Sequence, residues 1–143
     1  ANRFLSVWAE LNTPPPAGLS RHQVVVLASL VEKETAAPAE RPLIAGVFLN
    51  RLARNMRLQS DPTVIYGLGP GFSGPLTRAH LRAPSPTNTY LISGLPPTPI
   101  CNPGRAALEA ALHPASTKAL YFVARGDGTH VFSRTLQEHN QAV

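Results

Sequence analysis

The chain is poor in cysteine, in aromatic residues and in charge. Cys101 is its single cysteine, which excludes an intramolecular disulfide and a cysteine-based metal cluster. Aromatic residues make up 6% and charged residues 15% of the 143 residues, while 43% are hydrophobic. A chain of this length and hydrophobicity is expected to form one domain with a buried core. No apolar run approaches the roughly 18 residues that a membrane-spanning helix needs, and no signal peptide is visible.

The charge that is present is mainly positive. Lys and Arg number 13 against 8 Asp and Glu, which gives a formal charge of +5 and a pI near 10.1. The basic residues are spread along the chain, so they favour polyanions in general. They form neither a zinc finger nor a basic heptad helix nor an RNA-binding signature. No nucleic-acid partner is therefore expected.

The sequence also contains no pattern typical of a metal site or of a catalytic nucleophile. No metal-ligand spacing relates the histidines, which are His22, His80, His113, His130 and His139. Ser29 and Cys101 have no sequence-level partner that would mark either as a nucleophile. We therefore expect no metal site.

Periodicity and turn signals predict a mainly helical chain with one hairpin. Residues 1–19 are expected to form a short helix and a proline-rich linker, and residues 20–143 the core of the domain. Helices are predicted over about 20–35, 42–55 and 102–114 and from about 135. Residues 59–101 are predicted as a long ordered loop, and 126–128 as the turn of a β-hairpin. The predicted class is α+β.

Acidic residues crowd the end of the most apolar segment. Glu32 and Glu34 follow VVVLASLV, and Glu40 is close behind, so 3 of the 8 acidic residues fall within VEKETAAPAE. A carboxyl beside apolar side chains loses hydration, so its pKa rises and it carries a proton near neutral pH. Periodicity does not choose between Glu32 and Glu34, because a helix that is apolar all round does not show which carboxyl faces inward. The alternative is that both are solvated at a helix end, paired with Lys33 or Arg41.

Two polar clusters in the loop region are candidates for ligand binding. They are Gln59, Asp61 and Tyr66 in LQSDPTVIYGLG, and Asn88, Thr89 and Tyr90 in SPTNTY. Amides and hydroxyls bond sugar hydroxyls and aromatic rings cover the C–H face of a sugar, so both clusters suit a glycan. Turn chemistry explains the same residues almost as well, with Asp61 capping the segment after Pro62. His130 opens the second hairpin strand and either reaches a site or lies at the surface.

Several blocks of the chain resemble a known family. They are LASLVEKETAAPAERPLIAGVFLNRL, MRLQSDPTVIYGLG, LTRAHLRAPSPTNTYLISGLPPTPICNPG and ALHPASTKALYFVARGDGTHVFSRTLQEHN, in order and nearly without gaps over about 24–140. They look like the catalytic domain of the MltG-type (YceG-like) endolytic murein transglycosylases. The resemblance implies a fold similar to lysozyme-like and spore-cortex-lytic enzymes, in which a buried glutamate precedes a helix ending in an apolar-Asn-Arg turn, here Leu49-Asn50-Arg51.

The resemblance also implies a reaction. The family cuts peptidoglycan strands internally, at the bond between N-acetylmuramic acid and N-acetylglucosamine, and leaves 1,6-anhydro ends without a metal or organic cofactor. It implies Glu32, the first glutamate of EKET, as the catalytic acid. It assigns Glu34 to a supporting role and the two polar clusters to the glycan groove. At Thr87 the chain departs from the PYNTY-like pattern of many relatives, which removes one aromatic surface.

The resemblance implies a location as well. Family members are anchored in the inner membrane by a single span, with the catalytic domain facing the periplasm and cell wall, and peptidoglycan synthases are candidate partners. The usual membrane helix and LysM-like region do not occur in these 143 residues. Two alternatives stay open: a muramidase that activates water with Asp61 as second carboxylate, and a non-catalytic peptidoglycan-binding module.

Overall fold

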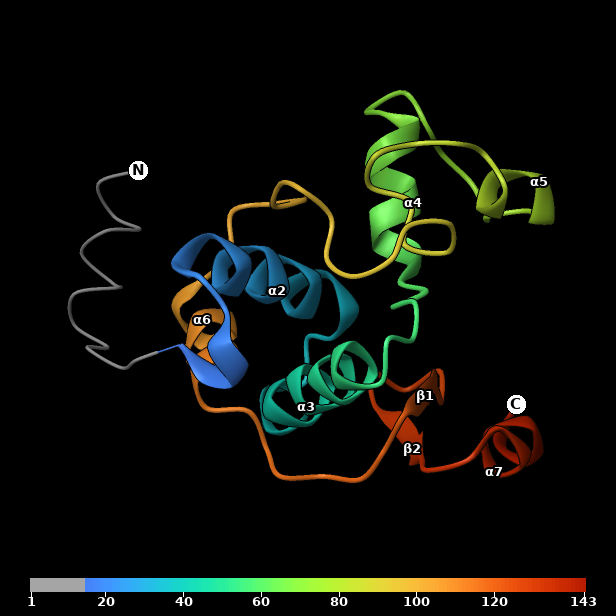
Figure 1. The fold of residues 1–143 in the computed structure, drawn as a ribbon. Coiled ribbons are helices and arrows are strands. Elements are labelled where there is room, and N and C mark those ends of the chain that lie inside the picture. The colour runs from blue at the N-terminus through green and yellow to red at the C-terminus, as the bar shows by residue number, and fades with distance from the viewer. Residues whose placement is uncertain (1–14) are drawn as a thin grey trace.

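A computed structural model describes residues 15–143 (Figure 1). Its elements are η1 (Pro16–Gly18), α2 (Arg21–Glu34), η2 (Pro38–Glu40), α3 (Arg41–Ala53), α4 (Asp61–Leu68), α5 (Arg78–Leu81), α6 (Arg105–Leu112), β1 (Tyr121–Ala124), β2 (His130–Ser133) and α7 (Leu136–Ala142). The class predicted from the sequence, α+β with a small antiparallel sheet, is confirmed. The helix expected before the proline-rich segment lies outside the described residues.

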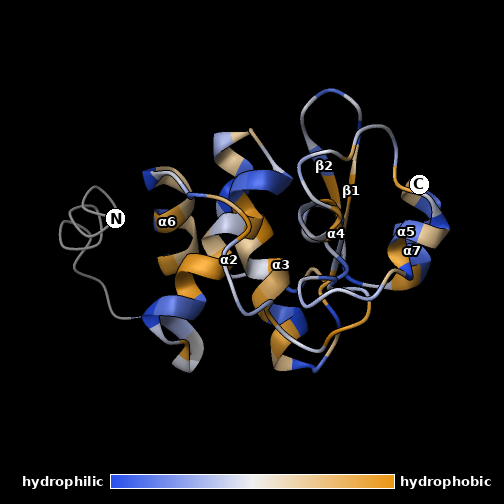
Figure 2. Cartoon of the chain, turned by 90° about the horizontal axis from the view of Figure 1, so that it is seen from above, coloured by the Kyte–Doolittle hydropathy of each residue, from blue (hydrophilic) through white to orange (hydrophobic). Residues whose placement is uncertain are grey.

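Helix α2 is the centre of the hydrophobic core. Ser20 caps it: the Ser20 hydroxyl accepts from the Gln23 N–H at 3.1 Å, and the Gln23 side chain accepts from the Ser20 N–H at 2.9 Å. From residue 24 to residue 31 it is buried except at Val25, as its nearly continuous apolar sequence predicts. Its partners are α3 and α6, whose apolar faces turn toward it while polar residues lie outside (Figure 2).

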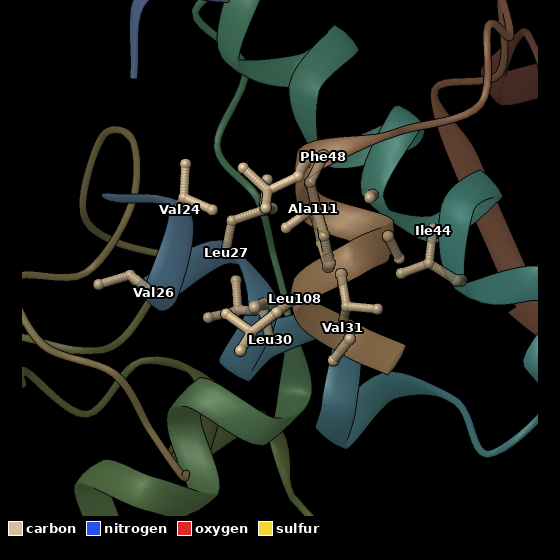
Figure 3. Close-up of a cluster of buried hydrophobic side chains, with 14 of the residues drawn as sticks. Val24, Val26, Leu27, Leu30, Val31, Ile44, Phe48, Leu108 and Ala111 are labelled. Carbon is tan, nitrogen blue, oxygen red and sulfur yellow. The ribbon is translucent and has the colours of Figure 1, made fainter. Parts of the chain in front are cut away.

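The side chains of these three helices interlock. Leu27 and Leu30 of α2, Phe48 of α3 and Leu108 of α6 lie within one cluster and are at most 1% exposed (Figure 3). Gly46 of α3 permits a close approach, because a Cβ there would lie 2.7 Å from the Ala115 carbonyl oxygen. The hairpin lies on the side of α3 away from α6 (Figure 1), and its Phe122 and Phe132 pack against the edge of this core.

The hairpin matches the prediction. Strands β1 and β2 pair antiparallel, with Tyr121 opposite Ser133 and Ala124 opposite His130. The turn uses Gly126 at φ 90° and Gly128 at φ 91°, where glycine avoids the strain that a side chain would meet. This pairing fixes the position of His130 at the start of β2.

The prediction of a long loop over 59–101 is wrong in part. Helix α4 begins at Asp61-Pro62, where a first-turn proline costs no hydrogen bond and an aspartate favours the positive end of the helix dipole. The glycines and prolines around it obscured a short helix of eight residues. Gly67 lets α4 pack against residues 85–87, because a Cβ there would lie 2.5 Å from the Ser85 hydroxyl.

The end of α3 joins the core to the hairpin. The Asn50 amide donates to the carbonyl oxygens of Thr117 at 2.7 Å and Ala119 at 2.9 Å. The buried Arg51 donates from Nε to Leu120 O at 2.7 Å and from Nη1 to Arg57 O at 2.8 Å. These bonds satisfy backbone carbonyls on both sides of α3, so β1 and the segment before α4 are held next to each other.

Candidate active site

A cavity of about 460 Å³ opens where these segments meet. The C-terminal end of α2, the segment before α4, the hairpin and α7 all contribute to its wall. It is lined by Glu34, Arg51, Leu58, Gln59, Asp61, Tyr90, Tyr121, Phe122, Ala124, His130, Leu136, His139 and Asn140. Distant parts of the sequence therefore combine into one polar and aromatic site.

Glu34, the last residue of α2, carries the carboxyl group with the most altered protonation. Burial raises its pKa, the hydrogen bond from the Ser60 hydroxyl to Oε2 at 3.2 Å opposes this, and the charge of Asp61 raises it again. The net effect raises the pKa of Glu34 from 4.5 to about 7. A carboxyl with such a pKa holds a proton in neutral solution and releases it readily, as a general acid must.

Glu32, the acid that the resemblance implies, is not among the residues that line this cavity. Its Oε1 accepts the Gly104 backbone N–H at 2.7 Å, and Gly104 is the N-cap residue of α6. Successive helix residues are rotated by about 100°, so Glu32 and Glu34 point about 200° apart. Glu32 therefore bonds to the segment that begins α6, while Glu34 faces the cavity.

Three predicted groove residues do line the cavity, namely Gln59, Asp61 and Tyr90. The Tyr90 hydroxyl donates a short hydrogen bond to Asp61 Oδ1. Burial, this bond and the charge of Asp61 together raise the pKa of Tyr90, so its hydroxyl stays protonated. Gln59 has a φ of 51°, a left-handed conformation that is uncommon for a residue with a side chain, and its N–H donates to Thr89 O at 3.2 Å.

Asn88 and Thr89 lie behind the cavity, so the prediction that they line a groove is wrong. Both are 0% exposed. The Asn88 amide donates to Leu81 O at 3.0 Å, and its oxygen accepts the Tyr90 N–H at 2.9 Å. The Thr89 hydroxyl accepts the Ser60 N–H at 2.8 Å. These residues position Ser60 and Tyr90, which in turn contact Glu34 and Asp61.

Tyr66 lies apart from the other predicted residues. It is 48% exposed and borders a second cavity of about 710 Å³, with Lys33, Pro62 and Ile65 among the lining residues. Lys33 precedes Glu34 in the chain and Pro62 follows Asp61, so both cavities draw lining residues from the end of α2 and the start of α4. Thr87 is buried and lines neither cavity.

Sequence reasoning missed most of the wall that the hairpin and α7 supply. Arg51 lies 4.9 Å from the centre of the Tyr121 ring in a cation–π contact, and the His139 ring stacks on the same tyrosine, with centroids 5.2 Å apart. Nothing in the spacing of these residues reveals that the hairpin returns to the end of α2. The one signal in the sequence is His130 at the start of the second hairpin strand, where it either reaches a site or lies at the surface.

Within residues 15–143 no group of three or more His, Cys, Asp or Glu side chains has an arrangement that could hold a metal ion. In the same part of the chain no helix is both long and apolar enough to cross a bilayer.

The fold and the cavity define a small helical α+β domain with a carboxyl of raised pKa in a polar, aromatic pocket. Comparison with known proteins identifies it further: the chain belongs to the YceG-like family, which matches residues 2–143. The resemblance noted from the sequence blocks is thereby confirmed.

Relatives with curated names agree. A Bacillus subtilis (strain 168) protein named "Endolytic murein transglycosylase" is 48% identical over 124 residues, covering 87% of this chain and 34% of that protein. A protein of the same name from Streptococcus pneumoniae serotype 2 (strain D39) is 36% identical over 130 residues, covering 87% and 24%. The chain thus spans about a third of the length of the first relative and about a quarter of the second.

A solved structure supports the same fold. The crystal structure of a YceG-like protein from Listeria monocytogenes has a TM-score of 0.79 and 41% sequence identity to this chain. The match covers 97% of this chain and 42% of the Listeria chain.

Proposed function

We propose that this chain is the catalytic domain of an endolytic murein transglycosylase that cuts peptidoglycan glycan strands internally, with Glu34 as the catalytic acid. The observation that carries the proposal is the Glu34 carboxyl, whose pKa is raised to about 7 inside the cavity. The names of the relatives from Bacillus subtilis and Streptococcus pneumoniae support the substrate and the reaction class. Glu32, which the resemblance implies as the acid, is kept as the alternative; its Oε1 accepts the Gly104 backbone N–H at 2.7 Å, and it does not line this cavity.

The proposed reaction needs one carboxyl group. Glu34 gives its proton to the oxygen that joins N-acetylmuramic acid to N-acetylglucosamine as the bond from that oxygen to C1 breaks. The resulting carboxylate then takes the proton of the C6 hydroxyl while the C6 oxygen bonds to C1 and closes the 1,6-anhydro ring. Glu34 regains its proton, so atoms and charge balance and neither step calls for a metal or organic cofactor.

The two cavities offer a path for a long strand. Gln59, Asp61 and Tyr90 provide amide, carboxylate and hydroxyl contacts beside Glu34. Tyr66, in the second cavity, provides an exposed aromatic face for a sugar ring further along α4. An endolytic enzyme must hold sugars on both sides of the bond that it cuts, and a second cavity lined from the same helices would hold sugars beyond the first one.

A muramidase is the second candidate, because Asp61 shares the cavity with Glu34 and supplies the second carboxylate that hydrolysis with water requires. Digestion of purified sacculi followed by mass spectrometry separates the candidates. We expect anhydro ends, lighter by one water than the reducing ends that a hydrolase leaves. Reducing ends alone would show a muramidase, and binding without released fragments would show a non-catalytic module.

The natural setting proposed for this domain is the cell wall. The formal charge of +5 favours association with an anionic polymer, which salt would weaken. Anchoring by a membrane span outside these 143 residues, with the domain on the wall side of the inner membrane, and cooperation with peptidoglycan synthases belong to the same proposal.

The raised pKa of Glu34 predicts how cleavage depends on pH. The acid must be protonated, so kcat/KM is expected to be maximal below about pH 7 and to fall about tenfold for each further pH unit above it. This pH dependence is tested by measuring kcat/KM at constant ionic strength from about pH 5 to about pH 9, on both sides of the raised pKa. The charge of Asp61 helps raise the pKa, so in Asp61→Asn the descending limb should move to lower pH. A limb that stays in place in this variant would contradict the assignment.

A further inference from the structure

The hairpin brings the His130 imidazole into the cavity, and Glu40 forms hydrogen bonds with that residue. His130 lines the cavity together with Glu34. Its ring Nδ1 lies 2.8 Å from Glu40 Oε1, and its backbone N–H donates to Glu40 Oε2 at 2.7 Å. Only 9% of the His130 side chain and 13% of the Glu40 side chain are exposed. Both oxygens of one nearly buried carboxylate are thus bonded to one residue, and neither side chain can turn without losing a hydrogen bond.

Further contacts restrain the same pair. The Phe122 ring meets the His130 ring edge to face, with centroids 5.5 Å apart at 83°. The Thr35 hydroxyl, at the end of α2, donates to Glu40 Oε1 at 3.4 Å. Burial by itself would raise the pKa of Glu40, but the hydrogen bonds from His130 outweigh it and hold this pKa below its ordinary value. Glu40 is therefore a carboxylate, which can only accept hydrogen bonds.

This arrangement selects one form of the imidazole. Because Glu40 accepts from Nδ1, the neutral ring carries its hydrogen there and leaves Nε2 as an acceptor. Among residues 15–143 Nε2 has no hydrogen-bond partner, and it belongs to a ring that lines the cavity. An oriented base held by a carboxylate is an arrangement that enzymes use to present Nε2 to a ligand.

We propose that His130 is a substrate-contact residue whose Nε2 accepts a hydrogen bond from an O–H or acetamide N–H of the bound glycan, and that Glu40 is the positioning residue that fixes this tautomer. The inference rests on the proposed function, because it takes the ligand of the cavity to be an acetamido-sugar strand. It adds to that function a contact that the carboxyl chemistry of Glu34 does not require.

Two substitutions of His130 distinguish the contribution of Nδ1 from that of Nε2. In His130→Asn the amide reaches only about as far as Nδ1, whereas in His130→Gln it reaches the position of Nε2. For a soluble chitooligosaccharide we expect His130→Asn to raise the Kd about 3- to 10-fold, the value of one neutral hydrogen bond, and His130→Gln to keep most of the affinity. On sacculi, KM should rise by the same factor with kcat changed less. His80→Asn, at a histidine outside the cavity, is the matched control and should bind as wild type does.

Nitrogen NMR of the labelled full chain reads the tautomer directly. At a pH where the His130 ring is neutral, we expect Nδ1 to be protonated and Nε2 to shift on addition of the chitooligosaccharide. Glu40→Gln should populate both tautomers, because an amide can donate to Nδ1 as well as accept from it. It should weaken binding in parallel, and Glu40→Gln combined with His130→Asn should bind no worse than His130→Asn alone.

Any one of three outcomes overturns the proposal. These are a neutral wild-type ring with its hydrogen on Nε2, an Nε2 resonance that does not shift when the chitooligosaccharide is added, and equal affinity of wild type and His130→Asn for the chitooligosaccharide. A wild type that neither binds nor cuts glycan would refute the proposed function, and with it the glycan contact. That result differs from a failure of the inference alone, in which wild type and His130→Asn cut sacculi with the same KM.

Discussion

Glu34→Gln is expected to reduce the rate of sacculus digestion by at least about 100-fold, the usual contribution of a general acid. Glutamine has the shape of glutamate and can still accept the hydrogen bond from Ser60, but it has no proton to give to the glycosidic oxygen. Binding of a chitooligosaccharide should change little, because the loss is confined to the chemical step. Released fragments are counted by chromatography and identified by mass spectrometry.

Glu32→Gln is the matched control, two residues away on the opposite face of α2. The variant keeps an oxygen that can accept from Gly104 N–H, so cleavage should stay within a few-fold of the wild-type rate. If Glu32→Gln abolishes cleavage and Glu34→Gln spares it, the acid is the residue that the family resemblance first indicated. If both variants cut normally, neither glutamate is the acid.

The raised pKa of Glu34 also makes the stability of the folded protein depend on pH, which can be measured without substrate. The pKa of Glu34 in the folded state, about 7, lies above the ordinary value of 4.5, so the folded protein binds this proton more tightly than the unfolded chain. The stability that Glu34 contributes is therefore fully present below about pH 4.5 and is lost as pH rises through about 7. Relative to wild type, Glu34→Gln should become progressively more stable across this window in urea unfolding. A difference that does not vary with pH would mean that the carboxyl is not shifted.

Much of the fold could be predicted because local signals determined it. The Ser20 cap, the apolar run of α2 and the glycines of the hairpin turn each specify a structure within a few residues. Helix α4 was missed because Pro62 and the glycines that follow favour turns as much as a helix start. Tertiary packing favours the helix here, because Gly67 allows α4 to approach Ser85 closely.

The site was predicted only in part, for a physical reason. Local sequence places Glu32 and Glu34 at the end of a buried helix, but which one faces inward depends on segments 26 or more residues away: Ser60 bonds to Glu34, and Gly104 bonds to Glu32. Likewise Asn88 has the chemistry of a sugar-binding amide, yet its amide is used by backbone carbonyls. The type of a residue limits the partners to which its side chain can bond. Tertiary packing determines which of those partners it contacts.

Phe48→Ala is expected to lower the free energy of unfolding by about 3–5 kcal/mol, the largest effect on stability in the core. Phe48 is fully buried between α2, α3 and α6 (Figure 3), so truncation leaves a cavity in addition to losing apolar contact. Total stabilities are typically about 5–15 kcal/mol, so the variant should unfold at a much lower urea concentration. Leu91→Ala, at a leucine that is 40% exposed, should cost within about 0.5 kcal/mol and serves as the control.

The effect of Phe48→Ala should extend from the core to the cavity. Phe48 meets Phe122 edge to face, with ring centroids 5.8 Å apart, and Phe122 in turn packs on His130. Removing the first ring therefore loosens the support of the hairpin wall, and the folded variant should show an altered His130 tautomer balance as well as a raised KM. Glu34→Gln, by contrast, should lose cleavage while its stability stays equal or rises. If Phe48→Ala costs less than about 1 kcal/mol, Phe48 is not part of a close-packed core and the link from core to cavity fails with it.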